Sequence, residues 1–166
     1  MERWSIEVEK EYLKFSAAHF LIFPDGSAER LHGHNYRVYA ALEARLSRYG
    51  LVLDFRHIKP MIRELVGELD ERWILPAEHP ELRAERRADG VVEVRYRERY
   101  YAAPAEDVLL LPLNNTSAEN LSTLLGRRLL ERLRARHPDV AVRRLSLGVE
   151  ETAGQRGVYR FEAESA

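Results

Sequence analysis

The chain has 166 residues, of which 45% are hydrophobic and 32% are charged, and its formal net charge is −1. This composition predicts one folded domain over residues 1–166, and its balanced charge gives no reason to expect nucleic acid or a membrane surface as partner. The sequence contains no cysteine, so disulfides, thiolate metal sites and cysteine nucleophiles are excluded. It has no apolar run of membrane-spanning length and no secretory signal pattern at its N-terminus, so we expect a cytoplasmic protein.

Two strands and a helix are predicted in the first half of the chain. The segment around Ile6 and Val8 alternates apolar and acidic residues, and residues 36–46 alternate apolar and polar residues, as half-buried strands do. After Asp54, which is a typical N-cap residue, the apolar residues recur at helical spacing. The predicted helical stripe consists of Ile58, Met61, Ile62, Leu65, Val66, Leu69 and Trp73.

The second half contains a less regular segment, a helix and two strands. Residues 77–112 are predicted to be an insertion, with Asp89-Gly90 at the turn of a hairpin. The second helix is expected after a capping box of Thr116 and Glu119, and two strands follow it. The order strand, strand, helix, inserted hairpin, helix, strand, strand predicts the α+β class, with an antiparallel sheet and its helices on one face.

Two histidines stand one residue apart in the segment RLHGHNYRVYA, residues 30–40. Side chains two apart on a strand share a face, so His32 and His34 project together. His19 ends the preceding predicted strand, and three imidazoles with one open position are typical of a catalytic zinc site. Nitrogen ligands favour zinc over magnesium or calcium. From the motif alone, an ordinary pair of surface or turn histidines remains an alternative.

Five segments occur in an order that resembles a known family. Together they resemble the 6-pyruvoyltetrahydropterin synthase and 6-carboxytetrahydropterin synthase superfamily over most of the chain apart from residues 77–112. The segments are FSAAHF at 15–20, LHGHNYRVYAALEA at 31–44, GLVLDFRHIKPMIRELVGELD at 50–70, NTSAENLSTLL at 115–125 and LGVEET at 147–152.

The resemblance implies the tunnelling fold, a four-stranded antiparallel sheet with two helices on one face. It also implies trimers that stack into a homo-hexamer, with a small pterin substrate bound at a subunit junction that includes Asn115 or Ser117. The family's pterin anchor falls on Glu151, although a carboxylate there could instead pair with one of the many arginines. The family's zinc ligands fall on His19, His32 and His34.

The chain departs from this family at the residues that transfer protons. The synthases carry a catalytic cysteine before the H-G-H motif, and they follow the first helix with an Asp-His pair where this chain has Asp70 and Glu71. One branch, which resembles a dihydroneopterin aldolase, instead has the pattern E-x-x-H-G-H, which Glu29 and His32 fit. Glu29 can reach the metal face only if residues 24–31 fold over it. Otherwise it is a solvated loop acid, and Glu71 is the competing candidate for proton transfer.

Three functions are compatible with these residues. The first is a zinc-dependent lyase that cleaves the side chain of 7,8-dihydroneopterin, or its phosphate, to 6-hydroxymethyl-7,8-dihydropterin and glycolaldehyde. The second is a 6-pyruvoyl- or 6-carboxytetrahydropterin synthase that acts on dihydroneopterin triphosphate without a cysteine. The third is a homologue that binds zinc and a pterin but catalyses nothing. The sequence favours the first.

Overall fold

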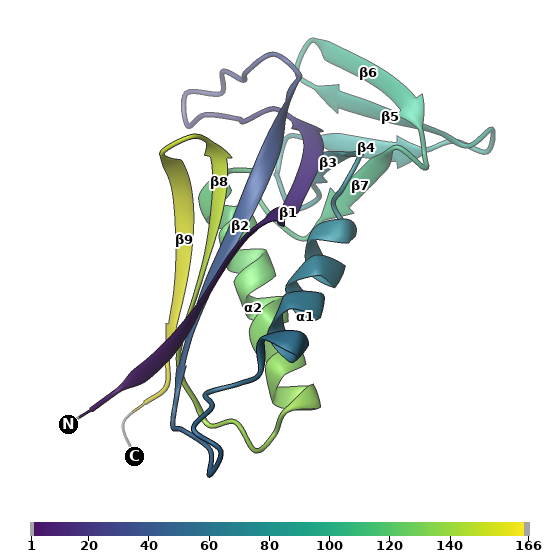
Figure 1. Cartoon of the computed structure of the whole chain (residues 1–166). Coiled ribbons are helices and arrows are strands. Elements are labelled where there is room, and N and C mark those ends of the chain that lie inside the picture. Colours follow the sequence, from purple (N-terminus) through teal and green to yellow (C-terminus); the bar gives the residue numbers. More distant parts are fainter. Residues whose placement is uncertain (1, 165–166) are drawn as a thin grey trace. The chain divides into compact units, whose positions relative to one another are not determined.

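The computed structural model describes residues 2–164 (Figure 1). The contacts of these residues divide into two compact units. Unit 1 contains the described parts of residues 1–15, 35–68 and 118–166, and unit 2 contains residues 16–34 and 69–117. The elements in chain order are β1 (Trp4–His19), β2 (His32–Ala44), α1 (Phe55–Gly67), β3 (Arg72–Pro76), β4 (Arg83–Arg86), β5 (Val91–Tyr96), β6 (Arg99–Pro104), β7 (Val108–Leu111), α2 (Ala118–Arg136), β8 (Val142–Thr152) and β9 (Gln155–Glu162).

The main sheet has six strands in the order β7-β3-β1-β2-β8-β9. The four predicted strands are present, and β8 pairs antiparallel with both β2 and β9. The predicted four-stranded, purely antiparallel sheet is wrong in its extent, because β3 pairs parallel with the end of β1 and β7 pairs parallel with β3. These two strands come from residues 72–76 and 108–111, which the sequence analysis did not assign to the sheet.

The first helix ends earlier than its apolar stripe predicted. α1 ends at Gly67, and Trp73 lies in β3 rather than in the helix. Glycine is a poor helix former, and Glu71 has a left-handed backbone with φ of 57°, so the chain turns between α1 and β3. The other end of α1 is as predicted, since the side chain of Asp54 accepts a hydrogen bond from the backbone N–H of Arg56.

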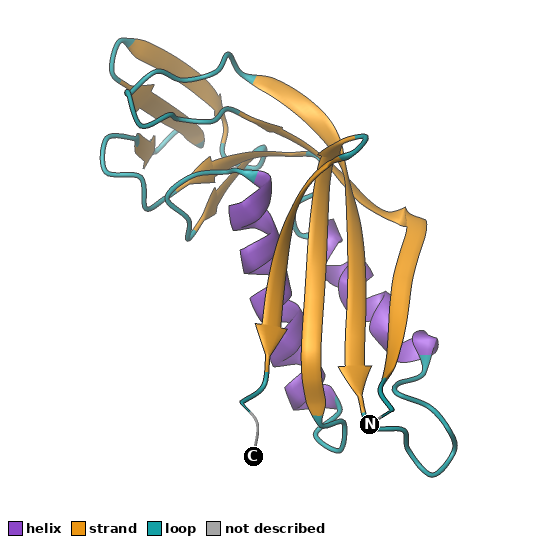
Figure 2. Ribbon diagram, turned by 90° about the vertical axis from the view of Figure 1, so that its left-hand side faces the viewer, coloured by secondary structure: helices purple, strands orange, loops and turns teal. Residues whose placement is uncertain are grey.

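Unit 1 has both helices on one face of its long strands (Figure 1, Figure 2). The inward rows of β2 and β8 are buried, as their alternation predicted, and Tyr36, Leu42 and Leu147 are fully enclosed. α2 packs on β8, β9 and α1. Gly126 of α2 is required by this packing, because a Cβ there would overlap the ring of Tyr159 on β9.

Unit 2 contains a separate three-stranded antiparallel sheet in the order β4-β5-β6. Asp89 and Gly90 lie in the turn between β4 and β5, as predicted, but the predicted hairpin has a third strand, β6. The core of this unit is a cluster of eight buried side chains: Phe20, Ile22, Trp73, Leu75, Leu82, Val92, Val94 and Tyr96. None of the helices in the described residues is long and apolar enough to span a membrane.

Candidate metal centre

Three histidines converge where β1 ends and β2 begins, within unit 2. Leu13, Phe15 and Ala17 of β1 are buried in strict alternation, and His19 is the next residue in that phase and is fully buried. His32 and His34 continue the inward phase of β2 toward its start. The ring centroids of the three histidines lie 4.7 to 5.2 Å apart. The predicted convergence of the three imidazoles is therefore present.

Backbone carbonyls orient two of the three rings. His19 Nδ1 lies 3.2 Å from the carbonyl oxygen of Thr116, and His32 Nδ1 lies 2.7 Å from that of Arg30. A ring nitrogen that donates to a carbonyl leaves the opposite nitrogen as a metal ligand, and this arrangement is usual around protein-bound metals. Thr116 was predicted as a helix cap, but α2 begins at Ala118, and the Thr116 side chain is buried beside His19 instead.

The donor set fits a divalent metal. Each histidine offers one ligand nitrogen, and the three nitrogens lie within 4.8 Å of one another. Gly33 suits the close approach of the two strands, because a Cβ there would make a tight contact, 3.3 Å, with the carbonyl oxygen of Ala17. Three neutral imidazoles match the ligand preference of a catalytic zinc site, which keeps one position for water or substrate.

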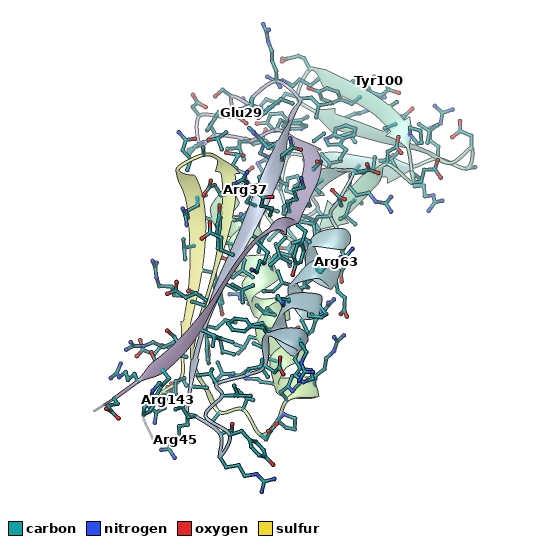
Figure 3. The ribbon with its side chains drawn as sticks, viewed as in Figure 1. Glu29, Arg37, Arg45, Arg63, Tyr100 and Arg143 are labelled. Atoms are coloured by element: carbon teal, nitrogen blue, oxygen red, sulfur yellow. The ribbon has the colours of Figure 1, made fainter. Side chains whose placement is uncertain are left out.

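The carboxylate of Glu29 lies at the edge of this centre. Its Oε2 is 3.8 Å from His32 Nε2 and accepts a hydrogen bond from the backbone N–H of Leu21 at 3.1 Å. The backbone N–H of Glu29 donates in return to the carbonyl of Leu21. The loop between β1 and β2 therefore folds back on itself, and Figure 3 shows Glu29 on it. At 32% exposure, the side chain is accessible to a ligand of the centre.

Asp70 and Glu71, the other predicted proton-transfer residues, lie at a different place in unit 2. Asp70 Oδ1 accepts the backbone N–H of Ser16 at 2.7 Å, and the backbone N–H of Glu71 donates to the Ser16 carbonyl. Both side chains are exposed. The structure gives this pair a role in joining the start of β3 to β1, and a role in proton transfer stays a prediction.

The predicted pterin-binding residues are divided between the two units. In unit 1, Glu151 Oε1 accepts a hydrogen bond from the hydroxyl of fully buried Tyr36 at 3.3 Å. Tyr36 was not predicted from the sequence as the partner of Glu151, although its place in the inward row of β2 does indicate that its side chain points into the core. In unit 2, the Asn115 amide pairs with the backbone N–H and carbonyl of Ile22, and Ser117 directly precedes α2. Contacts of Glu151, Asn115 and Ser117 with a pterin remain predictions.

Comparison with known proteins decides the family. A profile of the 6-pyruvoyl tetrahydropterin synthase family matches residues 7–162. The chain belongs to this family. A Methanocaldococcus jannaschii protein, named as a proposed 6-carboxy-5,6,7,8-tetrahydropterin synthase, is 36% identical over 123 residues, which cover 74% of each chain. A Pyrococcus horikoshii protein with the same name is 29% identical over 71% of this chain and 70% of that one.

Solved structures of the family share the fold. The structure of 6-pyruvoyltetrahydropterin synthase from Plasmodium vivax has 25% sequence identity and a TM-score of 0.91, and the match covers 98% of this chain and 100% of that one. The relatives support a pterin enzyme of the tetrahydropterin synthase type. They do not support the aldolase interpretation that the sequence analysis put first, and its synthase alternative fits them better.

Proposed function

We propose that this protein is a zinc-dependent synthase that converts dihydroneopterin triphosphate to a 6-carboxy- or 6-pyruvoyl-tetrahydropterin without a cysteine. Glu29 is its general base, and His19, His32 and His34 hold the zinc. The names of the relatives support the product class. The observation that carries the proposal is the Glu29 carboxylate, 3.8 Å from a ring nitrogen of His32 in a chain that has no cysteine.

A zinc ion held by the three imidazoles would act as a Lewis acid toward the hydroxyl groups of the pterin side chain. The remaining chemistry belongs to the chain's own residues. Loss of triphosphate requires that a base remove a proton from the neighbouring side-chain carbon, so that the electron pair of the broken C–H bond forms a double bond as the triphosphate leaves. The ring gains its two hydrogens from the side chain, whose hydroxyl-bearing carbons become carbonyls, so no external reductant is needed. A 6-carboxy product also requires that water cleave the side chain and that its two outer carbons leave as a two-carbon aldehyde. A carboxylate at the edge of the metal centre is placed to take that proton.

Two further observations support a carboxylate in this role. Two solved structures from Plasmodium vivax are variants of a 6-pyruvoyltetrahydropterin synthase in which a glutamate, described there as a catalytic residue, is replaced by alanine or by cysteine. In this chain, Leu21 fixes the Glu29 carboxylate through one hydrogen bond and leaves its other oxygen available.

The pterin end of the substrate would be held by Glu151, because a carboxylate can accept both of the parallel donors on the edge of the pterin ring.

A dihydroneopterin aldolase is the second candidate, and the E-x-x-H-G-H pattern without cysteine is the observation that favours it. In that reaction the carboxylate would take the proton from the 2′-hydroxyl, and the 1′–2′ carbon bond would break. The pterin ring would accept the resulting electron pair, and a proton would then return to the 1′ carbon.

Product analysis distinguishes the candidates. The zinc-loaded protein is incubated separately with dihydroneopterin and with its triphosphate, and the products are resolved by mass. The synthase predicts free triphosphate and a 6-carboxy- or 6-pyruvoyl-tetrahydropterin from the second substrate only. Glycolaldehyde with 6-hydroxymethyl-7,8-dihydropterin would identify the aldolase. Pterin binding without turnover of either substrate would refute both, and it would leave a protein that only binds zinc and a pterin.

A further inference from the structure

The three-stranded sheet of β4, β5 and β6 has no part in the chemistry proposed above, yet it contacts the loop that carries Glu29. The two segments are about 70 residues apart in the sequence and belong to the same compact unit. Phe20 and Ile22 of the loop share a core cluster with Val92, Val94 and Tyr96 of the sheet. The rings of Phe20 and Tyr101 also stack, with centroids 5.8 Å apart. The loop is therefore packed against the sheet along its apolar side.

Polar contacts from the residues on either side of the turn between β5 and β6 fix the loop backbone. The hydroxyl of Tyr96, which is buried, donates to the carbonyl of Gly26 at 2.8 Å. The guanidinium of Arg99 donates to two consecutive carbonyls, those of Ala28 and Glu29. Because a guanidinium is a planar fork of donors, two such bonds set both the position and the direction of the peptide that they hold.

The tip of the loop is shaped to accept the same turn. Gly26 has φ of +82°, and a Cβ there would overlap the guanidinium of Arg97. Arg97 itself is held by Glu81, with Nε 3.0 Å from Oε2. The left-handed backbone favours glycine at this position, and a larger residue would also displace the Arg97 guanidinium.

We infer that Arg99 is a positioning residue, which fixes the carboxylate of Glu29 beside His32 by binding the carbonyls of Ala28 and Glu29. The three-stranded sheet then has a functional purpose: it is the rigid support from which Arg99 and Tyr96 hold the loop. The catalytic purpose of this support rests on the proposed function of Glu29. A displacement of about 1 Å in a catalytic group can cost about 10²-fold in rate, so a loop without this support would bind substrate but turn it over slowly.

The structural part of the inference is tested by hydrogen–deuterium exchange on the full chain. Arg99→Met keeps most of the apolar stem of the side chain and removes its donors, and Arg95→Met is the matched control, because Arg95 is an exposed arginine of the same sheet that pairs with Glu93. We expect exchange in residues 21–31 to become roughly 10- to 100-fold faster in Arg99→Met and to stay unchanged in Arg95→Met. Tyr96→Phe, which keeps the buried ring, should show a smaller increase. Unchanged exchange in both Arg99→Met and Tyr96→Phe would overturn the inference.

The catalytic part is tested by kinetics on the same variants. Arg99→Met should lower kcat by about 10²-fold with little change in KM or zinc content. Because Arg99 acts through Glu29, the double variant Glu29→Gln/Arg99→Met should be no slower than Glu29→Gln alone. Losses that multiply in the double variant would overturn the inference. If exchange rises in Arg99→Met while Glu29→Gln is fully active, the support of the loop stands and the proposed base is wrong.

Discussion

Replacing Glu29 by glutamine separates proton transfer from binding. Glu29 Oε2 accepts the Leu21 N–H at 3.1 Å and lies 3.8 Å from His32 Nε2. A glutamine side chain retains an oxygen that can accept the Leu21 N–H, so the loop should keep its conformation. It cannot accept a proton at neutral pH, and loss of a general base costs about 10²–10⁴-fold in rate. This corresponds to roughly 2.7–5.5 kcal/mol in activation free energy.

The assay combines steady-state kinetics with metal analysis and pterin binding. We expect Glu29→Gln to keep zinc and pterin affinity and to lose turnover. Glu71→Gln is the matched control, since Glu71 stands where the family has its histidine and lies at Ser16 rather than at His32. If Glu71→Gln abolishes activity while Glu29→Gln is silent, Glu29 is not the base, and Asp70 and Glu71 are the proton-transfer pair. Full activity in both variants would exclude both carboxylates as the base.

Four further predictions concern metal, substrate, assembly and pH. His32→Ala should be strongly depleted in zinc by elemental analysis, whereas His57→Ala should retain it; full occupancy in His32→Ala would contradict the site. Glu151→Gln should weaken pterin binding by about one to two powers of ten in a fluorescence titration, and unchanged affinity would place the anchor elsewhere. Light scattering should show a trimer or hexamer, because β9 leaves an open edge on the sheet, and a stable monomer would contradict this. The hydrogen bonds from Arg56 lower the pKa of Asp54 to about 2, so their stabilising effect is present above pH 4 and is lost as the pH falls toward 2. Asp54→Asn should reduce this acid-dependent fall in Tm. An unaltered dependence of Tm on pH in the variant would argue against a stabilising role of the Asp54 carboxylate.

The convergence of the three histidines was largely predictable from the sequence because strand phase is a local property. The alternation of β2 sets the directions of His32 and His34, and the end of β1 sets that of His19. The helix start at Asp54 was predictable for the same reason, since a cap acts within one turn. The placement of Glu29 was not predictable, because it depends on how the loop between the two strands folds.

Contacts between distant segments account for what the sequence analysis missed. Trp73 continued the helical period of α1, but residues 72–76 are a buried strand, and the left-handed Glu71 that separates the two elements has no clear sequence pattern. Arg99 reaches carbonyls about 70 residues away, and no periodicity records such a contact. The apolar run from Trp73 to Leu75 is the one indication that could have revealed β3.

A zinc-dependent synthase without a cysteine must release triphosphate from dihydroneopterin triphosphate, and it must do so only while the metal is bound. Free triphosphate is measured after the protein is mixed with dihydroneopterin triphosphate, first with zinc bound, then after chelation, and again after zinc is restored. The synthase function predicts release that stops on chelation and returns with zinc, with a tetrahydropterin product in equal amount and no glycolaldehyde. Formation of glycolaldehyde without release of triphosphate would contradict it.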